Sequence, residues 1–154
     1  MKELVKLLSL NHKTISVMES CTGGGLANAI TNIEGASDII SFGAVTYSNE
    51  DKIKMGVNKK TIEKYSVYSI EVANEMSKNI SNYTNSNYGI GVTGQLKRKD
   101  PNNKTDEDNK VYISIYDRDN NKYYNEIVIA NKFTRRANKS KVIKKIVKKF
   151  SEIL

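Results

Sequence analysis

The spacing of apolar residues changes along the chain and predicts alternating helices and strands. The first ten residues repeat leucine at helical spacing, and residues 14–19 form a short apolar run typical of a buried strand. A helical pattern over residues 26–33 follows three glycines, and residues 38–48 predict a second strand. We expect this second strand to bury three side chains, namely Phe42, Ala44 and Val45.

The middle of the chain predicts two more helices and a central strand. Residues 58–65 and 69–83 have helical patterns, and Ser69 has the short hydroxyl side chain of an N-cap for the longer helix. Residues 88–94 are mainly small and β-branched. Such a thin layer of side chains allows helices to pack closely, so we expect this strand to lie in the middle of the sheet.

A hairpin and a long helix complete the pattern. Two alternating runs at 110–117 and 122–130 are separated by a polar turn and predict antiparallel strands. The last helix carries apolar residues at helical spacing with lysines between them. Helix–strand units followed by a hairpin and a helix predict an α/β fold, a three-layer α/β/α sandwich with a mixed sheet, as one domain over residues 1–154.

The longest polar stretch, residues 95–110, is predicted to be a mobile loop. It contains the only proline, Pro101, and it is too polar for the core and too long for a tight turn. It follows the strand-end pair Thr93-Gly94, and residues 19–25 also follow a strand end. Because the carboxyl ends of strands surround the ligand crevice in open α/β sheets, both loops are candidates for a binding site.

Composition limits the chemistry that the chain can perform. The single cysteine, Cys21, cannot form an internal disulfide, and the single histidine, His12, cannot complete a Cys/His zinc site. His12 lies in a polar turn after the first helix, which favours a surface histidine over a member of a catalytic triad. A carboxylate-held magnesium stays open but has no clear motif. With no bilayer-length apolar run and no secretory leader, we expect a cytoplasmic protein.

The net charge of +8 raises the question of nucleic-acid binding. The charge is concentrated in residues 135–150, where the apolar positions recur at helical spacing. This pattern favours a helix that packs through its apolar stripe and exposes its lysines to solvent. We therefore expect no nucleic-acid partner.

The stretch ESCTGGG at residues 19–25 is the main candidate for chemistry. Thr22 and the glycines offer backbone N–H groups at a helix start, which can hold an anion. The residues alone leave open whether Ser20 or Thr22 merely caps that helix. A nucleophilic Ser20 would need a base, and a lysine kept neutral by burial or by neighbouring cations could serve. Composition does not select which lysine.

The chain resembles the CinA carboxy-terminal domain family, whose stand-alone members include PncC-type nicotinamide-nucleotide amidohydrolases. Weaker agreement continues from the specific motifs as far as residue 117, so the resemblance covers nearly the whole chain. The molybdopterin-binding-like domain that precedes this one in full-length CinA proteins is not expected here. The matching motifs are ESCTGG at 19–24, EGASD at 34–38, TYSNEDK at 46–52 and Gly56-Val57.

The resemblance implies a three-layer α/β/α fold and hydrolysis of the carboxamide of nicotinamide mononucleotide. The products would be nicotinate mononucleotide and ammonia, and no metal or organic cofactor would be required. The serine nucleophile of the family falls on Ser20 and its lysine partner on Lys52. The tyrosine and asparagine of the second motif fall on Tyr47 and Asn49, and the strand-end hydroxyl residue falls on Thr93.

Each of these side chains suits a step of amide hydrolysis. Neutral Lys52 would take the Ser20 proton and return it to the leaving nitrogen, while Tyr47 would relay or orient that proton. Asn49 would hold the carboxamide. Backbone N–H groups near Cys21 or at Gly94 would stabilise the oxyanion. The anion-holding frame around the nucleophile would consist of Thr22, Gly23 and Gly24.

Two departures from the family pattern affect the ligand. The family usually continues after the strand-end Thr-Gly with a Gly/Ala-Gly-Pro loop, but here residues 95–98 read QLKR. The family also has a Phe-x-Gly-x-Arg element before the last helix, with its arginine facing the ligand phosphate. The equivalent segment here lacks the glycine and is one residue shorter, which places that arginine at Arg136, with Arg135 as the alternative. A guanidinium can pair bidentately with phosphate. Two interpretations of the altered loop stay open: the basic run 97–99 compensates for the lost loop contacts, or the substrate has changed.

These features support three hypotheses of function. The first is an amidohydrolase of pyridine-nucleotide salvage with a small-molecule nucleotide substrate. The second is a non-catalytic homologue that binds a nucleotide or a protein partner. The third is a nucleic-acid-binding competence factor, based on charge and on the historical name of the family. By analogy with the family, we expect a homo-oligomer.

Overall fold

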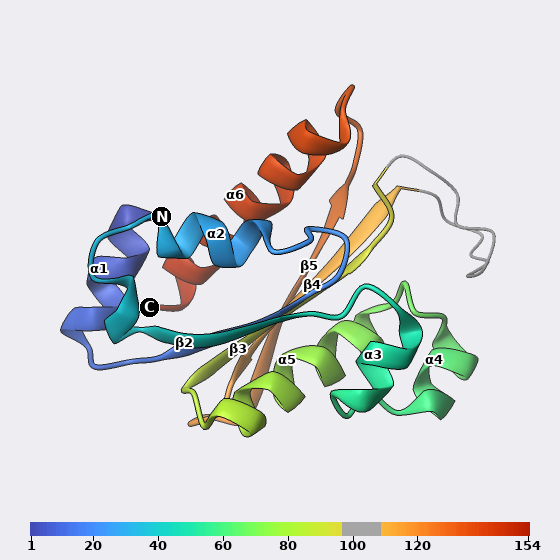
Figure 1. Ribbon diagram of the computed structural model, residues 1–154, viewed down its shortest axis with the longest axis horizontal. Helices are drawn as coiled ribbons and strands as arrows, with labels where there is room; N and C mark the ends of the chain where they lie inside the picture. Colours follow the sequence, from blue (N-terminus) through green and yellow to red (C-terminus); the bar gives the residue numbers. More distant parts are fainter. Residues whose placement is uncertain (97–108) are drawn as a thin grey trace.

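The computed structural model, which describes residues 1–96 and 109–154, is an α/β/α sandwich (Figure 1). A five-stranded sheet of order β2-β1-β3-β4-β5 lies between α1, α2 and α6 above and α3, α4 and α5 below (Figure 1). The predicted fold class is confirmed. The elements are α1 (Lys2–Leu10), β1 (Ile15–Glu19), α2 (Gly25–Thr31), a 3₁₀ turn (Ala36–Asp38), β2 (Ile40–Val45), α3 (Asn49–Lys54), α4 (Lys59–Tyr65), α5 (Ile70–Thr84), β3 (Tyr88–Gly94), β4 (Lys110–Asp117), β5 (Lys122–Ile129) and α6 (Arg135–Ile153).

The sheet is mixed, as predicted. Strand β1 pairs in parallel with β2 and β3, and β3, β4 and β5 pair antiparallel. The central position expected for β3 is confirmed, and its glycines explain the close cover by α5. A Cβ atom at Gly91 would lie 2.3 Å from the carbonyl oxygen of Ala73, so only glycine fits there.

The burial expected for β2 is wrong at two positions. Phe42 is 38% exposed and Val45 is 52% exposed, while Ala44 is half-buried. The cause is the place of β2 at the edge of the sheet, where helices cover it incompletely. The ring of Phe42 instead packs against Tyr83, with 5.3 Å between centroids. An apolar run shows that a strand is present, but it does not show where the strand lies in the sheet.

Helix α3 occupies a segment for which the apolar pattern predicted neither a helix nor a strand. Ser48 is its N-cap, and the Ser48 side chain accepts a hydrogen bond from the N–H of Asp51 at 3.0 Å. Asn49 is the first helical residue. The helix is six residues long and mostly polar, which is why it gives no apolar periodicity.

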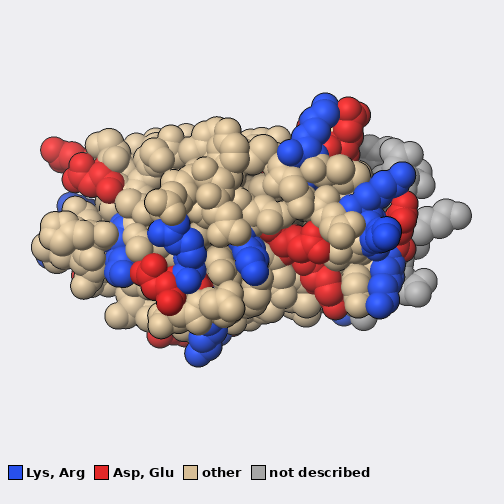
Figure 2. All heavy atoms as spheres, turned by 90° about the horizontal axis from the view of Figure 1, so that it is seen from below, with Lys and Arg blue, Asp and Glu red and all other residues tan. Residues whose placement is uncertain are grey.

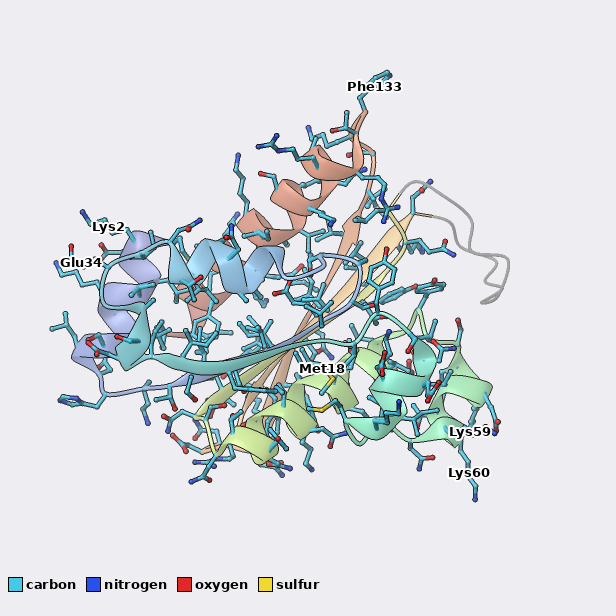
Figure 3. All side chains as sticks on the ribbon, viewed as in Figure 1. Lys2, Met18, Glu34, Lys59, Lys60 and Phe133 are labelled. Atoms are coloured by element: carbon cyan, nitrogen blue, oxygen red, sulfur yellow. The ribbon has the colours of Figure 1, made fainter. Side chains whose placement is uncertain are left out.

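Two apolar cores lie on opposite faces of the sheet. The upper core joins α1, α2 and α6 to the sheet, and in α6 it includes Val142, Ile146 and Phe150. The lower core packs Met18 of β1 against Met76 of α5, and Met18 is seen between the sheet and that helix in Figure 3. Ser69 caps α5, as predicted, by accepting a hydrogen bond from the Val72 N–H.

The start of the predicted loop belongs to the core. Gln95 is 5% exposed and Leu96 is 2% exposed, which corrects the expectation that this stretch is too polar to be buried. The chain is still antiparallel to β4 at this point, because the N–H of Gln95 donates to the Lys110 carbonyl at 2.9 Å. The remainder of the loop, with Pro101 and the basic run 97–99, lies outside the described residues. In the described ranges, none of the helices combines the length and apolarity needed to cross a bilayer.

Candidate active site

The nucleophile candidate Ser20 lies where β1 ends and the chain turns into α2. Its N–H extends the sheet by donating to the Val92 carbonyl at 3.0 Å, and its side chain is only 7% exposed. The next residues reverse the chain sharply, with φ of 60° at Gly23 and 85° at Gly24. These left-handed conformations favour glycine, so the two glycines hold the serine at the carboxyl edge of the sheet.

Lys52 reaches Ser20 from the neighbouring strand connection. Its Nζ donates to Ser20 Oγ at 3.0 Å and to the Thr46 carbonyl at 2.6 Å. Thr46 follows β2 and donates its N–H to the Glu19 carbonyl at 2.8 Å, so the parallel pairing of β1 and β2 brings the two segments together. The predicted nucleophile and its predicted partner are therefore in hydrogen-bond contact.

The environment of Lys52 disfavours the charged form of its amine. The side chain is 1% exposed, and this burial lowers its pKa from 10.5 to about 8. No ion pair compensates the charge within the described residues, where the Nζ contacts are a hydroxyl and a carbonyl. A lysine of this kind can accept a proton near neutral pH.

The thiol of the adjacent Cys21 has low nucleophilicity. Cys21 is 4% exposed, and burial raises the pKa of its thiol to about 12. Because the thiolate is the nucleophilic form of cysteine, Cys21 is inert at neutral pH. Of the two side chains, Ser20 therefore stays the candidate nucleophile of this turn.

Glu19 has a role that the sequence did not reveal. Its carboxylate accepts the N–H groups of Leu26 at 3.0 Å and Ala27 at 2.8 Å, and it is fully buried. Glu19 thus caps α2, which answers the question that the residues alone left open: among the described residues, neither the Ser20 nor the Thr22 side chain caps this helix. It also occupies the amides of the first helical turn, so these are not free for a ligand. Glu19 lies six residues before the start of α2, which is too far for any local capping motif. The sharp turn at Gly23 and Gly24 brings its carboxylate back to the helix.

Several polar groups beside Ser20 have no partner among the described residues. The Gly23 N–H donates back to the Ser20 carbonyl at 2.9 Å, but the N–H groups of Cys21 and Thr22 donate to no other described residue. The side-chain oxygens Oγ1 of Thr22 and Oε1 of Gln95 are also buried without a hydrogen bond. Unpaired buried polar groups are rare in folded proteins. These four lie in the segments that follow β1 and β3, and a further one among the described residues, Asn74 Oδ1, belongs to α5.

Tyr47 lies at the outer rim of this edge. It is 61% exposed, and its hydroxyl accepts a hydrogen bond from Nη2 of Arg135 at 3.3 Å. Nη1 of Arg135 donates to the Leu96 carbonyl at 2.9 Å, which ties α6 to the end of β3. In the described part of the chain, Tyr47 makes no hydrogen bond to Ser20 or Lys52. Its role in proton relay stays a prediction.

The two candidate arginines for phosphate binding are placed differently. Arg135 contacts Tyr47 at the site, whereas Arg136 has no hydrogen bond or ion pair within the described residues. Helix α6 begins at Arg135, with Thr134 as N-cap, so consecutive residues point about 100° apart around the axis. The structure places Arg135, the alternative, at the site, and the spacing that favoured Arg136 could not resolve a difference of one residue.

The remaining predicted ligand contacts are at or beside the same edge. Thr93 is fully buried and donates its hydroxyl to the Val67 carbonyl at 2.9 Å, so its proton is already engaged. Gly94 packs against the backbone of β4, where a Cβ would lie 2.4 Å from the Lys110 carbonyl oxygen. Asn49 is half-buried at the start of α3. Substrate contacts of these residues and of the glycine turn stay predictions.

Comparison with known proteins identifies the family. The profile of the CinA C-terminal domain matches residues 1–154. The chain belongs to the CinA C-terminal domain family. Among solved CinA-related structures, a superfamily protein from Escherichia coli superposes with a TM-score of 0.88 at 22% identity, covering 99% of this chain and 87% of that one. The competence/damage inducible protein of Agrobacterium tumefaciens has a TM-score of 0.81 at 25% identity, covering 92% and 88%.

Curated relatives are longer than this CinA domain. A protein of Thermoanaerobacter sp. (strain X514), provisionally named competence-damage inducible protein, is 47% identical over 92 residues, which is 59% of this chain and 22% of that protein. A protein of the same name from Alkaliphilus oremlandii is 47% identical over 96 residues, 61% of this chain and 23% of that one. The matched part thus spans about a fifth of each relative, from 22% to 23% of its length.

Proposed function

We propose that this CinA domain is an amidohydrolase that converts nicotinamide mononucleotide to nicotinate mononucleotide and ammonia. The observation that supports it best is the contact of 3.0 Å between Ser20 Oγ and Lys52 Nζ, in a buried setting that lowers the pKa of Lys52 to about 8. A serine paired with a neutral lysine is a nucleophile and base suited to acyl transfer. The choice of substrate comes from the family resemblance.

In the first half of the proposed reaction, Ser20 Oγ attacks the carboxamide carbon while Lys52 Nζ takes the hydroxyl proton. The tetrahedral intermediate collapses as the carbon–nitrogen bond breaks, and Lys52 gives the same proton to the leaving nitrogen, so ammonia departs. In the second half, Lys52 takes a proton from water as the water oxygen attacks the acyl ester, and it returns that proton to Ser20 Oγ as the ester bond breaks and the carboxylic acid leaves. The Thr46 carbonyl holds Nζ in place through both halves, at 2.6 Å.

The developing negative charge needs hydrogen-bond donors that are already oriented. The N–H groups of Cys21 and Thr22 follow the nucleophile directly and donate to no other described residue. We assign them to the oxyanion. The amides of Leu26 and Ala27 cannot serve, because the Glu19 carboxylate occupies them.

The test is ammonia release from nicotinamide mononucleotide by the wild type and by Ser20→Ala and Lys52→Met variants. We expect each variant to lower kcat by about 10³-fold or more, because the nucleophile and its base act as a unit. Lys54→Ala is the matched control, since Lys54 lies on the same helix but is exposed and pairs with Glu50. Wild-type activity in the Ser20→Ala variant would exclude this mechanism.

A second candidate function is nucleotide binding without catalysis. It is favoured by the end of β3, where buried Gln95 and Leu96 replace the glycine-rich loop of the family and Arg135 fastens the Leu96 carbonyl. This function requires that nicotinamide mononucleotide binds and that no ammonia is released above the Ser20→Ala background. Calorimetric binding beside the ammonia assay separates the two functions.

A further inference from the structure

Glu19 connects the end of β1 to the first turn of α2 through its side chain. Its backbone is fixed in the sheet, because it pairs with β2 on one side and with β3 on the other. Its carboxylate accepts the N–H groups of Leu26 and Ala27, at 3.0 and 2.8 Å. Residues 20–25, which contain the candidate nucleophile and the glycine turn, therefore form a loop whose two ends are held by one residue.

This loop has few other restraints. Three of its six residues are glycines, and two of these have left-handed backbone conformations. Glycine has the largest backbone freedom of any residue, so such a turn does not keep one shape by itself. Among the described residues, the side-chain hydrogen bonds to residues 20–26 come from Lys52, which contacts the Ser20 hydroxyl, and from Glu19. Glu19 is thus the side chain that restrains the backbone of the loop.

The cap of α2 is a carboxylate, whereas the helices α3 to α6 have neutral caps. Each of these four helices is capped by the side chain of the residue just before it, namely Ser48, Asn58, Ser69 and Thr134. At α2 that position is Gly24, which has no side chain, and the capping carboxylate is fully buried. Burial of a carboxylate is costly, but its hydrogen bonds are about twice as strong as neutral ones. Such bonds exceed what the capping of a seven-residue helix requires.

Glu19 and the reacting groups lie on opposite faces of the sheet. Glu19 and Ser20 are consecutive, so the Glu19 side chain points towards α2 and the Ser20 side chain towards Lys52 of α3. Glu19 therefore does not contact the nucleophile. The loop that it holds contains the N–H groups of Cys21 and Thr22, which are the donors assigned to the oxyanion.

We propose that Glu19 is a positioning residue that fixes the direction of the Cys21 and Thr22 N–H groups towards the developing oxyanion. This inference rests on the proposed amidohydrolase function and adds a residue that acts without touching the substrate. Hydrogen-bond donors stabilise a transition state best when they already point at it. A loosened loop would therefore slow the reaction and leave substrate binding almost unchanged.

The first experiment measures kcat and KM for ammonia release by the Glu19→Gln variant. The side chain keeps its size, but one acceptor oxygen becomes an NH₂ donor that cannot receive an amide N–H. We expect kcat to fall by about 10-fold to 100-fold and KM to stay within about twofold of the wild type, because oxyanion donors act in the transition state. The rate should still level off above about pH 8, because burial of Lys52 sets that value.

Asn58→Ala is the matched control for the loss of a helix cap. It removes the 2.9 Å bond from the Lys60 N–H at the start of α4, a helix that contributes no described residue to the candidate site. Its Tm should fall while its kcat stays unchanged. If Glu19→Gln does not fold, Glu19→Asp replaces it, with a shorter reach and the same expectation. A fall in kcat smaller than about threefold, a rise in KM in place of that fall, or an equal loss in Asn58→Ala would overturn the proposal.

A second experiment does not depend on catalysis. The amide resonances of Cys21 and Thr22 are compared by heteronuclear NMR in the wild type, the Glu19 variant and Asn58→Ala. We expect these two resonances to shift or broaden in the Glu19 variant and to stay in place in Asn58→Ala. This result supports the positioning role even if the wild type releases no ammonia, in which case the proposed reaction fails and the restraint of the loop does not. No change, or changes confined to the two amides of α2 that the carboxylate binds, would reduce Glu19 to a helix cap and overturn the proposal.

Discussion

The amine of Lys52 lies in a buried environment that disfavours its positive charge. It is 1% exposed, and burial lowers its pKa to about 8. Since only the neutral amine can accept the Ser20 proton, we expect kcat/KM to rise about tenfold per pH unit below about pH 8 and to level off above it. Steady-state rates between about pH 6 and 9.5 test this. The control variant Lys54→Ala should show the same rise of kcat/KM below about pH 8. A flat profile would remove Lys52 as the base.

The same burial has a consequence for stability. The unfolded chain binds a proton at Lys52 up to the ordinary pKa of 10.5, whereas the folded protein loses it near pH 8. Between these values the unfolded state holds more protons, so stability rises with pH, and below about pH 8 the buried lysine costs about 3 kcal/mol.

Lys52→Met should therefore stabilise the inactive protein. The gain is at most about 3 kcal/mol at pH 7, reduced by the hydrogen bonds that Ser20 and Thr46 lose. We expect the gain to be largest below about pH 8 and to shrink as pH rises towards 10.5. Thermal unfolding at several pH values measures it. Lys144→Met, an exposed substitution, should show no such trend, and a gain independent of pH would contradict burial of the charged amine as its cause.

At the scale of elements, the close contact between β3 and α5 depends on two glycines. A Cβ at Gly91 would lie 2.3 Å from the Ala73 carbonyl oxygen, and one at Gly89 would lie 1.9 Å from the Ser77 carbonyl oxygen. Both obstacles are helix backbone, so they cannot move aside without shifting α5. The separation of helix and sheet is therefore set by these two positions.

Gly91→Ala should destabilise the fold by about 1–3 kcal/mol, as overpacking of a core does. A fall in Tm of roughly 2–4 °C for each kcal/mol is expected for a domain of this size. Gly25→Ala is the matched control, because its Cβ would lie 3.3 Å from Ile143 Cδ1, the end of a side chain. If Gly91→Ala were no less stable than Gly25→Ala, the glycines would not set this contact.

At the scale of the whole molecule, the chain has a net charge of +8, but acidic side chains lie between its basic ones. On the face shown in Figure 2, groups of lysine and arginine alternate with groups of aspartate and glutamate. Part of the basic charge of α6 is neutralised by Glu126, which pairs with Lys145 and Lys149. Nucleic-acid affinity requires several free cations along one surface.

We therefore expect only weak, sequence-independent binding of duplex DNA. Any retardation in a gel at about 50 mM salt should vanish by about 200 mM, because such binding is driven by counterion release. A mobility-shift titration at the two salt concentrations measures this. Binding that survives the higher salt would revive the hypothesis of a nucleic-acid-binding competence factor.

The sequence by itself determined the fold class and most of the elements. Apolar periodicity is a local property, and it located β1, β3, the β4–β5 hairpin and the long helices within a few residues. The family motifs also paired Ser20 with Lys52, although 32 positions separate them in the chain. Residue types and spacing were sufficient to predict a feature when it depends on interactions between nearby residues or when a specific family motif contains it.

Only the tertiary structure decided the rest. The exposure of Phe42 and Val45 follows from the edge position of β2, which depends on the order of strands and not on the strand itself. The cap supplied by Glu19 and the approach of Lys139 to Gly23 join segments whose separation in sequence carries no capping or pairing signal. The choice between Arg135 and Arg136 required the start and rotation of α6. These contacts arise from packing in three dimensions, so the amino-acid order alone could not fix them.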